Sequence, residues 1–230
     1  MSKLNFEHYT VVLNEIIRET GDVYTFRFDK PNMTWHEGTN IHLAFDDFLD
    51  HEPKKFVRHF SVTNLPSESY IAFTTRLSNS PYKNRLKSLK PGDHMILYKL
   101  SQRMKIRYEN RPLVLISMGV GIAAMKPIME TYVVTPDGIE SLTNITISKN
   151  EKIYKSYLEN LQGIQHNFVN NRKEFYHLIN ETYDHNNIYY IVGSDRFIED
   201  IILVLKHKGH HYSDIEIDKK QTKKDILLKP

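Results

Sequence analysis

Four consecutive residues, Arg58 to Ser61, carry side chains that could together bind a phosphorylated aromatic ligand. Arg58 could hold phosphate oxygens through two parallel hydrogen bonds, and the ring of Phe60 could pack on a flat heteroaromatic ring. The hydroxyl of Ser61 could donate to an edge of that ring. In a strand, Arg58 and Phe60 share one face, and His59 and Ser61 share the other. The set suits a flavin nucleotide, although such a run is also found in ordinary half-buried strands.

A second anion site is predicted at the start of a helix near residues 80–89. Ser80 is a favourable N-cap, Pro81 is a favourable first helical residue, and apolar residues at 82, 86 and 89 have helical spacing. Free N–H groups and the positive end of the helix dipole at this point would suit a pyrophosphate. A short connecting helix with an ordinary cap is the structural alternative.

The elements that carry these residues are short strands between Tyr9 and about Tyr108. Apolar and polar residues alternate between turn signals, which predicts strands at 9–17, 23–28, 41–45, 56–63, 70–76 and 94–100. Such a series, interrupted by one helix, favours a six-stranded antiparallel β-barrel.

From Leu113 onward, strands alternate with helices. Strands are predicted at 113–116, 145–147, 168–169, 188–192 and 215–217, and helices at 125–134, 152–161, 173–182 and 197–208. This order predicts an α/β domain with a doubly wound parallel sheet. We place a barrel domain at 1–109 and the α/β domain at 110–230, and we expect the charged tail from Lys219 to fray.

Glycines follow two strands of the predicted parallel sheet, where its ligands would bind. Gly119 and Gly121 follow the first strand and Gly193 follows the fourth, so the backbone could approach a phosphate or a nicotinamide closely. Ser148 and Lys149 follow the second strand, where an adenosine ribose would lie. A hydroxyl and a cation there favour NADPH over NADH, although an exposed lysine at a strand end is often simply solvated.

The order of these segments resembles the ferredoxin–NADP⁺ reductase-like superfamily over nearly the whole chain. The family flavin motif, Arg-x-aromatic-Ser, matches Arg58 to Ser61. The other matching segments are Phe73-Thr74-Thr75-Arg76 with Ser80-Pro81-Tyr82-Lys83 for the FAD pyrophosphate, Lys90-Pro91-Gly92-Asp93 for a turn, Gly119-Val120-Gly121-Ile122 for the pyridine-nucleotide loop, and Tyr189 to Ser194 for the strand that meets the nicotinamide.

The resemblance implies an FAD-dependent NAD(P)H oxidoreductase that uses NADPH or NADH, with NADPH slightly preferred. Ser61 would act near flavin N5 as the catalytic residue, and Gly193 with Ser194 would meet the nicotinamide. Electrons would pass to a separate acceptor, either a protein or a small molecule such as a ferric chelate. Two alternatives remain open: a flavoprotein electron-transfer subunit of a larger complex, and a non-catalytic flavin- or nucleotide-binding module.

The chain also departs from the family pattern in its nucleotide loop. The family places proline two residues after Gly-Ile, where this chain has Ala124, and Pro127 follows three positions later. A helix that starts later than in the family is therefore expected. Val192 replaces a frequent cysteine, and the chain lacks the C-terminal aromatic residue of plant-type members.

The composition is that of an ordinary soluble globular protein, with 40% hydrophobic and 26% charged residues. The net charge of +3 is spread along the chain and does not indicate nucleic-acid binding. The absence of cysteine excludes disulfides, thiolate nucleophiles and cysteine-ligated metals. The N-terminus has no apolar core long enough for a signal peptide, and the longest apolar run, Leu113 to Met125, is too short for a membrane span, so a cytoplasmic location is expected.

Two polar clusters are not predicted to be sites. His207, His210, His211 and Asp214 are expected to form a solvated loop and not a metal site, because ligands must converge on the ion. Asp46, Asp47, Asp50, His51 and Glu52 are expected to form an exposed acidic loop and not a pair of catalytic carboxylates.

Overall fold

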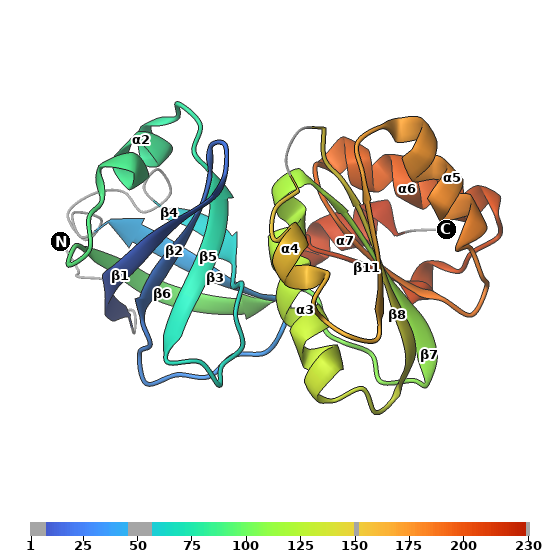
Figure 1. The fold of residues 1–230 in the computed structure, drawn as a ribbon, viewed down its shortest axis with the longest axis horizontal. Coiled ribbons are helices and arrows are strands. Elements are labelled where there is room, and N and C mark those ends of the chain that lie inside the picture. Colours follow the sequence, from blue (N-terminus) through green and yellow to red (C-terminus); the bar gives the residue numbers. More distant parts are fainter. Residues whose placement is uncertain (1–7, 46–56, 150–151, 229–230) are drawn as a thin grey trace. The chain divides into compact units, whose positions relative to one another are not determined.

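The computed structural model describes residues 8–45, 57–149 and 152–228, and it divides into two compact units between Gln102 and Arg103 (Figure 1). The domain limits of 1–109 and 110–230 remain a sequence prediction. The acidic residues between 46 and 52 lie outside the described residues. No helix in the described ranges is both long and apolar enough to cross a membrane.

The first unit is a six-stranded antiparallel sheet with the strand order β4-β3-β6-β1-β2-β5. Its strands are β1 (Tyr9–Thr20), β2 (Val23–Asp29), β3 (Thr39–Phe45), β4 (Val57–Ser61), β5 (Tyr70–Arg76) and β6 (His94–Gln102). A bridge between Val62 and Phe73 joins the two edges, and the N–H of Thr63 donates to the carbonyl of Ala72 at 3.0 Å. The sheet is therefore closed, which confirms the predicted six-stranded barrel.

Stacked aromatic rings fill the barrel because alternate strand residues point inward. The Phe73 ring lies 5.2 Å from the Phe26 ring, 6.0 Å from the Phe28 ring and 4.1 Å from the Phe60 ring, measured between centroids. Phe60 of the predicted ligand motif thus belongs to the barrel core.

The helix α2 (Pro81–Ser88) begins where the sequence predicts. The Ser80 hydroxyl accepts from the Lys83 N–H at 3.4 Å, as an N-cap does. The helix buries Tyr82 and Leu86 against the barrel, and the Tyr82 hydroxyl donates to the carbonyl of Leu43 at 3.0 Å. Burial and this hydrogen bond fix the helix start against β3.

The second unit is a parallel sheet with the strand order β11-β10-β7-β8-β9. Its strands are β7 (Arg111–Met118), β8 (Ile139–Ile147), β9 (Ile164–Val169), β10 (Ile188–Val192) and β11 (Ile215–Ile217). Its main helices are α3 (Ile122–Val134), α4 (Lys155–Leu158), α5 (Arg172–Glu181) and α6 (Asp195–His207). Figure 1 shows α3 and α4 on one face of the sheet and α5 and α6 on the other, which confirms the predicted doubly wound α/β arrangement.

Three predictions in this unit are wrong. The helix α3 starts at Ile122 instead of near Met125, since Pro127 is tolerated inside the helix. The helix α4 covers only Lys155–Leu158, because Tyr154 adopts a left-handed φ of 59° directly before it. The tail does not fray at Lys219, since its residues form α7 (Gln221–Leu227) and Leu227 packs on the sheet core.

Candidate functional site

The strand β4 presents Arg58 and Phe60 to the same neighbour, Tyr82. The guanidinium carbon of Arg58 lies 5.3 Å from the Tyr82 ring centroid, and the Phe60 centroid lies 6.1 Å from it. The ring of His59 instead packs on that of His42, with centroids 3.9 Å apart. Alternation places Ser61 on the side of His59. The structure therefore brings Arg58 and Phe60 together and turns His59 away from them.

Lys83 connects α2 to the same aromatic residues. Its Nζ lies 4.6 Å from the centroid of the Phe60 ring and donates to the Thr75 hydroxyl. Burial, reinforced by the positive charge of Arg58, lowers the pKa of Lys83 to about 8. Five predicted site residues on β4, β5 and α2 thus converge, and we call them the barrel cluster: Arg58, Phe60, Thr75, Tyr82 and Lys83.

The other residues predicted near the pyrophosphate have different contacts. The Thr74 hydroxyl lies 2.6 Å from that of Thr25, and Arg76 forms an ion pair with Asp22 beside the β1–β2 turn. Thr74 and Arg76 lie on the opposite face of β5 from Thr75, because strand side chains alternate. Pro81 opens α2 without contributing an N–H.

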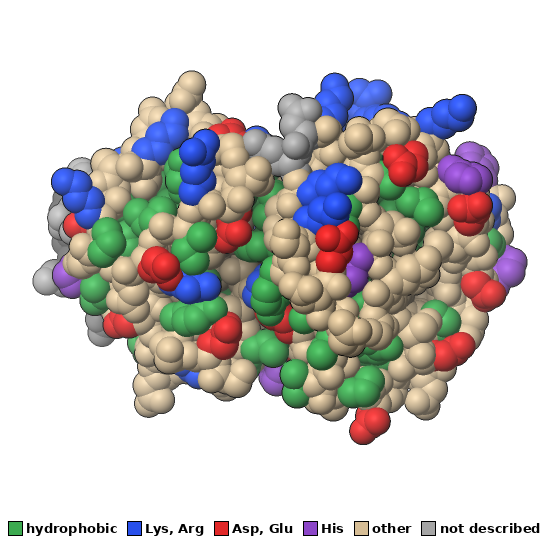
Figure 2. All heavy atoms as spheres, in the orientation of Figure 1, with side chains coloured by type: hydrophobic (Ala, Val, Ile, Leu, Met, Phe, Trp, Pro, Cys, Tyr) green, Lys and Arg blue, Asp and Glu red, His purple; other side chains and the backbone are tan. Residues whose placement is uncertain are grey.

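Basic side chains gather around the barrel cluster. Figure 2 shows Lys and Arg side chains over the region that α2 occupies in Figure 1. The Arg85 guanidinium lies 3.9 Å from the Phe45 ring centroid, and the Lys87 ammonium lies 3.0 Å from the Asn79 side-chain oxygen. Arg85 and Lys87 belong to the last turn of α2. The charges closest to the helix start are those of Arg58 and Lys83, and these favour a phosphate ligand.

Three glycines lie at neighbouring strand ends in the second unit, and we call Gly119, Gly121 and Gly193 the glycine edge. The pairing of Ser117 with Val192 places the carboxyl ends of β7 and β10 side by side. Two of these glycines are required by packing. A Cβ on Gly121 would lie 2.9 Å from the Val192 carbonyl oxygen, and a Cβ on Gly193 would collide with the Phe197 ring.

Gly119 differs from the other two glycines. Its φ of 55° is unfavourable for other residues, and no described atom lies within 4 Å of the position a Cβ would take. Gly119 is therefore the glycine of this edge whose Cβ position faces open space. Beside it, Ile122 is buried as the first residue of α3.

The residues around the glycine edge also have structural partners. The Ser194 hydroxyl accepts from the N–H of Phe197 at 3.2 Å and caps α6. Ser148 and Lys149 follow β8, and the N–H of Ser148 donates to the carbonyl of Val169 at 3.0 Å. The side chain of Lys149 is exposed. Ser148 and Lys149 therefore lie at the carboxyl edge of the sheet, as predicted.

Sequence reasoning missed Lys219 at this edge. Its ammonium donates to the Gly193 carbonyl at 3.3 Å and pairs with Asp195 at 2.7 Å. Lys223 also pairs with Asp195, at 3.3 Å, and both lysines lower the pKa of that carboxyl. The sequence signal for Lys219 was its position just after β11, at the carboxyl edge of the sheet. It was overlooked because residues from Lys219 onward were expected to fray.

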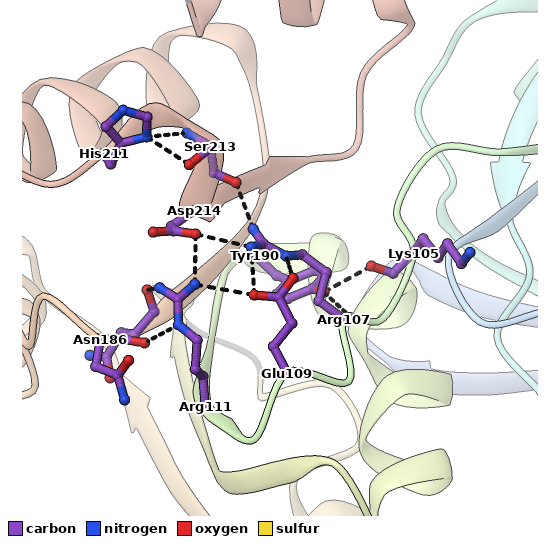
Figure 3. A network of polar contacts seen from close by, with 10 residues as sticks. Lys105, Arg107, Glu109, Arg111, Asn186, Tyr190, His211, Ser213 and Asp214 are labelled. Carbon is purple, nitrogen blue, oxygen red and sulfur yellow. Dashed lines mark hydrogen bonds and ion pairs between the residues drawn. The ribbon is translucent and has the colours of Figure 1, made fainter.

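A network of ion pairs lies at the opposite, amino edge of the parallel sheet (Figure 3). Arg107 contacts Glu109 at 2.6 Å and Asp214 at 3.0 Å, and Arg111 contacts Asp214 at 2.9 Å. The Tyr190 hydroxyl accepts from the Arg107 N–H at 2.9 Å. These contacts attach residues 103–109 to the second unit.

The expectation of a solvated loop around residues 207–214 is wrong for two of its members. His210 is 5% exposed and packs edge-on against the Tyr189 ring, with centroids 4.8 Å apart. Asp214 bonds to two arginines of the network in Figure 3. Within the described residues, no group of three or more potential ligands could hold a metal ion.

Comparisons with known proteins identify the fold. No protein-family model and no curated protein sequence match this chain. A ferredoxin–NADP⁺ reductase from Neisseria gonorrhoeae, with bound FAD and NADP, superposes with a TM-score of 0.76 and 16% identity over 94% of this chain and 98% of that one. The flavohem-like FAD/NAD-binding domain of nitric oxide dioxygenase from Vibrio cholerae O1 biovar El Tor gives a TM-score of 0.73 and 18% identity over 90% and 96% of the two chains.

A longer protein also contains this fold. Flavohemoglobin from Malassezia yamatoensis, with bound FAD and heme, gives a TM-score of 0.75 and 14% identity over 93% of this chain. The match covers 60% of the flavohemoglobin, so this chain spans less than two thirds of that protein. These similarities agree with the barrel and the parallel sheet described above. The chain has the two-domain fold of the ferredoxin–NADP⁺ reductase-like superfamily.

Proposed function

We propose that this protein is an FAD-dependent NAD(P)H oxidoreductase. The barrel would hold FAD and the second unit the nicotinamide nucleotide. When bound, these cofactors supply the redox chemistry, in which a hydride passes from nicotinamide to flavin and electrons pass on to an acceptor. The observation that carries the proposal is the convergence of two cations, a capped helix start and aromatic rings in the barrel cluster.

The donor set of the barrel cluster fits FAD. Arg58 and Lys83 supply positive charge beside the start of α2, where a diphosphate would be stabilised. Phe60 and Tyr82 place buried aromatic rings next to those cations. Ser61 would donate to the ring edge near flavin N5, as the catalytic residue of the proposal. The reductase from Neisseria gonorrhoeae, which has this fold, contains bound FAD and NADP.

The glycine edge would receive the nicotinamide nucleotide. Gly119 leaves space beside its backbone, and the Lys219 ammonium lies against the Gly193 carbonyl. Ser148 and Lys149 would contact the ribose phosphate, which favours NADPH over NADH. The acceptor would be a separate protein or a small molecule such as a ferric chelate, and the proposed location is the cytoplasm.

A second candidate function is a flavin-binding module that does not react with nicotinamide nucleotides. The packing of Gly121 against Val192 and of Gly193 against Phe197 favours it, because these glycines are explained without a nucleotide. Bound flavin would then stay oxidised when NADPH is added. In an electron-transfer subunit, NADPH would bleach the flavin band. The isolated chain would nevertheless not oxidise NADPH continuously with artificial electron acceptors.

The test is the visible spectrum of the purified protein after incubation with FAD and desalting. We expect a flavin band in the wild type and a much weaker one in the double variant Arg58→Met/Lys83→Met, with Lys87→Met as the matched control on the same helix. Stopped-flow mixing with NADPH and with NADH should bleach the band faster for NADPH. A wild-type protein without a flavin band would refute the proposal.

A further inference from the structure

Lys83 covers the face of the Phe60 ring that the barrel core leaves free. Phe73 stacks on the other face at 4.1 Å between centroids, with 20° between the ring planes. A ring stacked so closely leaves no room for an ammonium group on the same side. Lys83 Nζ, 4.6 Å from the Phe60 centroid, therefore lies on the opposite side, and Phe60 is only 8% exposed. A flat ligand could stack on Phe60 only if Lys83 moved away.

This position is unfavourable for a lysine. The ammonium group is half-buried and close to the positive charge of Arg58, and both effects lower its pKa. A lysine side chain is long enough to extend into water. Its contacts with the Thr75 hydroxyl and the Phe60 ring hold it in place instead.

We propose that Lys83 caps the Phe60 ring and that FAD displaces it when the flavin binds. The inference rests on the proposed function and adds a positioning role for Lys83. The displaced ammonium group can turn toward the phosphates, which would convert an unfavourable position into a favourable one.

Displacement should make FAD affinity depend on pH. When Lys83 leaves the ring, its pKa rises from about 8 toward the ordinary 10.5. A group whose pKa rises on binding takes up a proton, so affinity is full below pH 8 and falls above it. The groups that face Lys83 are Arg58 and Phe60 from β4 and the uncharged Thr75 from β5. Burial raises the pKa of the neighbouring Tyr82, and the pKa of Lys83, at about 8, is the one that lies between pH 7 and pH 9.

Carbon NMR of protein labelled with ¹³C-lysine tests the cap without any measurement of activity. We expect the ε-CH₂ proton signals of Lys83 to be shifted upfield by the Phe60 ring. The Lys83 signal is assigned by substitution, because other lysines also lie over aromatic rings: Lys30, Lys126, Lys206 and Lys208. That signal should disappear in Lys83→Arg and persist in Lys87→Met, whose residue lies one helical turn further along α2. Addition of FAD should move the signal back to the position of lysines that lie over no aromatic ring.

Equilibrium titrations with FAD at pH 7 and pH 9 give a second readout. We expect wild-type affinity to fall about tenfold between these values, as the change in pKa requires. The Lys83→Met variant should show no such fall, and Lys87→Met should behave as the wild type.

Three outcomes would overturn the inference: an upfield lysine pattern that is unchanged by Lys83→Arg, a Lys83 signal that stays in place when FAD is bound, or wild-type affinity independent of pH. Failure of FAD to bind at any pH would refute the proposed function and, with it, the displacement. The NMR spectrum of the protein without FAD shows whether Lys83 lies over Phe60, and it therefore distinguishes a missing cap from a failure to bind FAD.

Discussion

The barrel cluster and the glycine edge are built by different means. In the barrel cluster, side chains from three elements converge, and the Arg58 and Lys83 cations lie over aromatic rings. At the glycine edge the backbone itself is half-buried, and Gly121 has no space for a side chain. Substitutions in the barrel cluster should therefore change ligand binding without unfolding the protein. Substitutions at the glycine edge should mainly change the stability of the second unit.

The largest effect is expected from removing both cations of the barrel cluster. The double variant Arg58→Met/Lys83→Met should lose about 100-fold or more in FAD affinity at pH 7, because each hydrogen bond to a charged group contributes about 1.5–3 kcal/mol. Its free energy of unfolding should change by less than about 1 kcal/mol, since Arg58 is exposed and the loss of Lys83 removes an unfavourable charge. Fluorescence titration and urea unfolding measure the two quantities. An equal loss of affinity in Lys87→Met would show that general charge, and not the cluster, matters.

The glycine edge should show the opposite pattern. Gly121→Ala should lower the free energy of unfolding by about 1–3 kcal/mol, because its Cβ would press on the Val192 carbonyl, which β10 holds in place. Gly119→Ala should cost about 1 kcal/mol, since the space is open and only the left-handed φ of 55° is unfavourable. Urea unfolding of both variants measures this difference. Equal costs would mean that packing does not distinguish these glycines.

The two units should also depend on pH in different ways: FAD affinity of the barrel falls above pH 8, and the stability of the second unit falls below pH 6.5. Burial lowers the pKa of His210 below its ordinary 6.5, against the raising effect of Asp214, while His185 and Arg111 lower it further. The unfolded chain then binds a proton that the folded chain rejects, so stability is full above pH 6.5 and falls below it. The loss should not exceed about 1.4 kcal/mol per pH unit. The unfolding free energies of the wild type and of His210→Phe, measured between pH 7 and pH 5, test this. If both fell equally with pH, His210 would not be the source of the pH dependence.

Much of the fold could be predicted because its signals are local. The strands 70–76, 188–192 and 215–217 have the predicted limits, since alternation or a continuous apolar run marks each one. The Ser80-Pro81 start of α2 was predicted for the same reason, because N-cap chemistry depends on adjacent residues.

The rest could not be predicted because it depends on contacts between distant segments. Nothing local to Phe60 shows that Phe73 and Lys83 occupy both of its faces. The burial of His210 likewise depends on Tyr189, a residue on another element. The tail was misjudged because α7 has few apolar residues, and its place is fixed by the Lys224–Glu216 ion pair at 2.9 Å and by packing of Leu227.

The smallest effect is expected at Lys219, which was overlooked because the tail was expected to fray. Its ammonium group touches the Gly193 carbonyl, whereas Lys223 pairs with the carboxylates of Asp195 and Glu199. Lys219→Met should weaken NADPH binding by about threefold, the range of a partly exposed ion pair, and leave FAD affinity unchanged. Lys223→Met is the matched control and should keep wild-type NADPH affinity. Difference spectroscopy of the FAD-loaded protein with NADP⁺ measures both. If the two substitutions weakened NADPH binding equally, the effect would come from the Asp195 carboxylate that both lysines neutralise. The contact of Lys219 with the Gly193 carbonyl would then have no role of its own in binding.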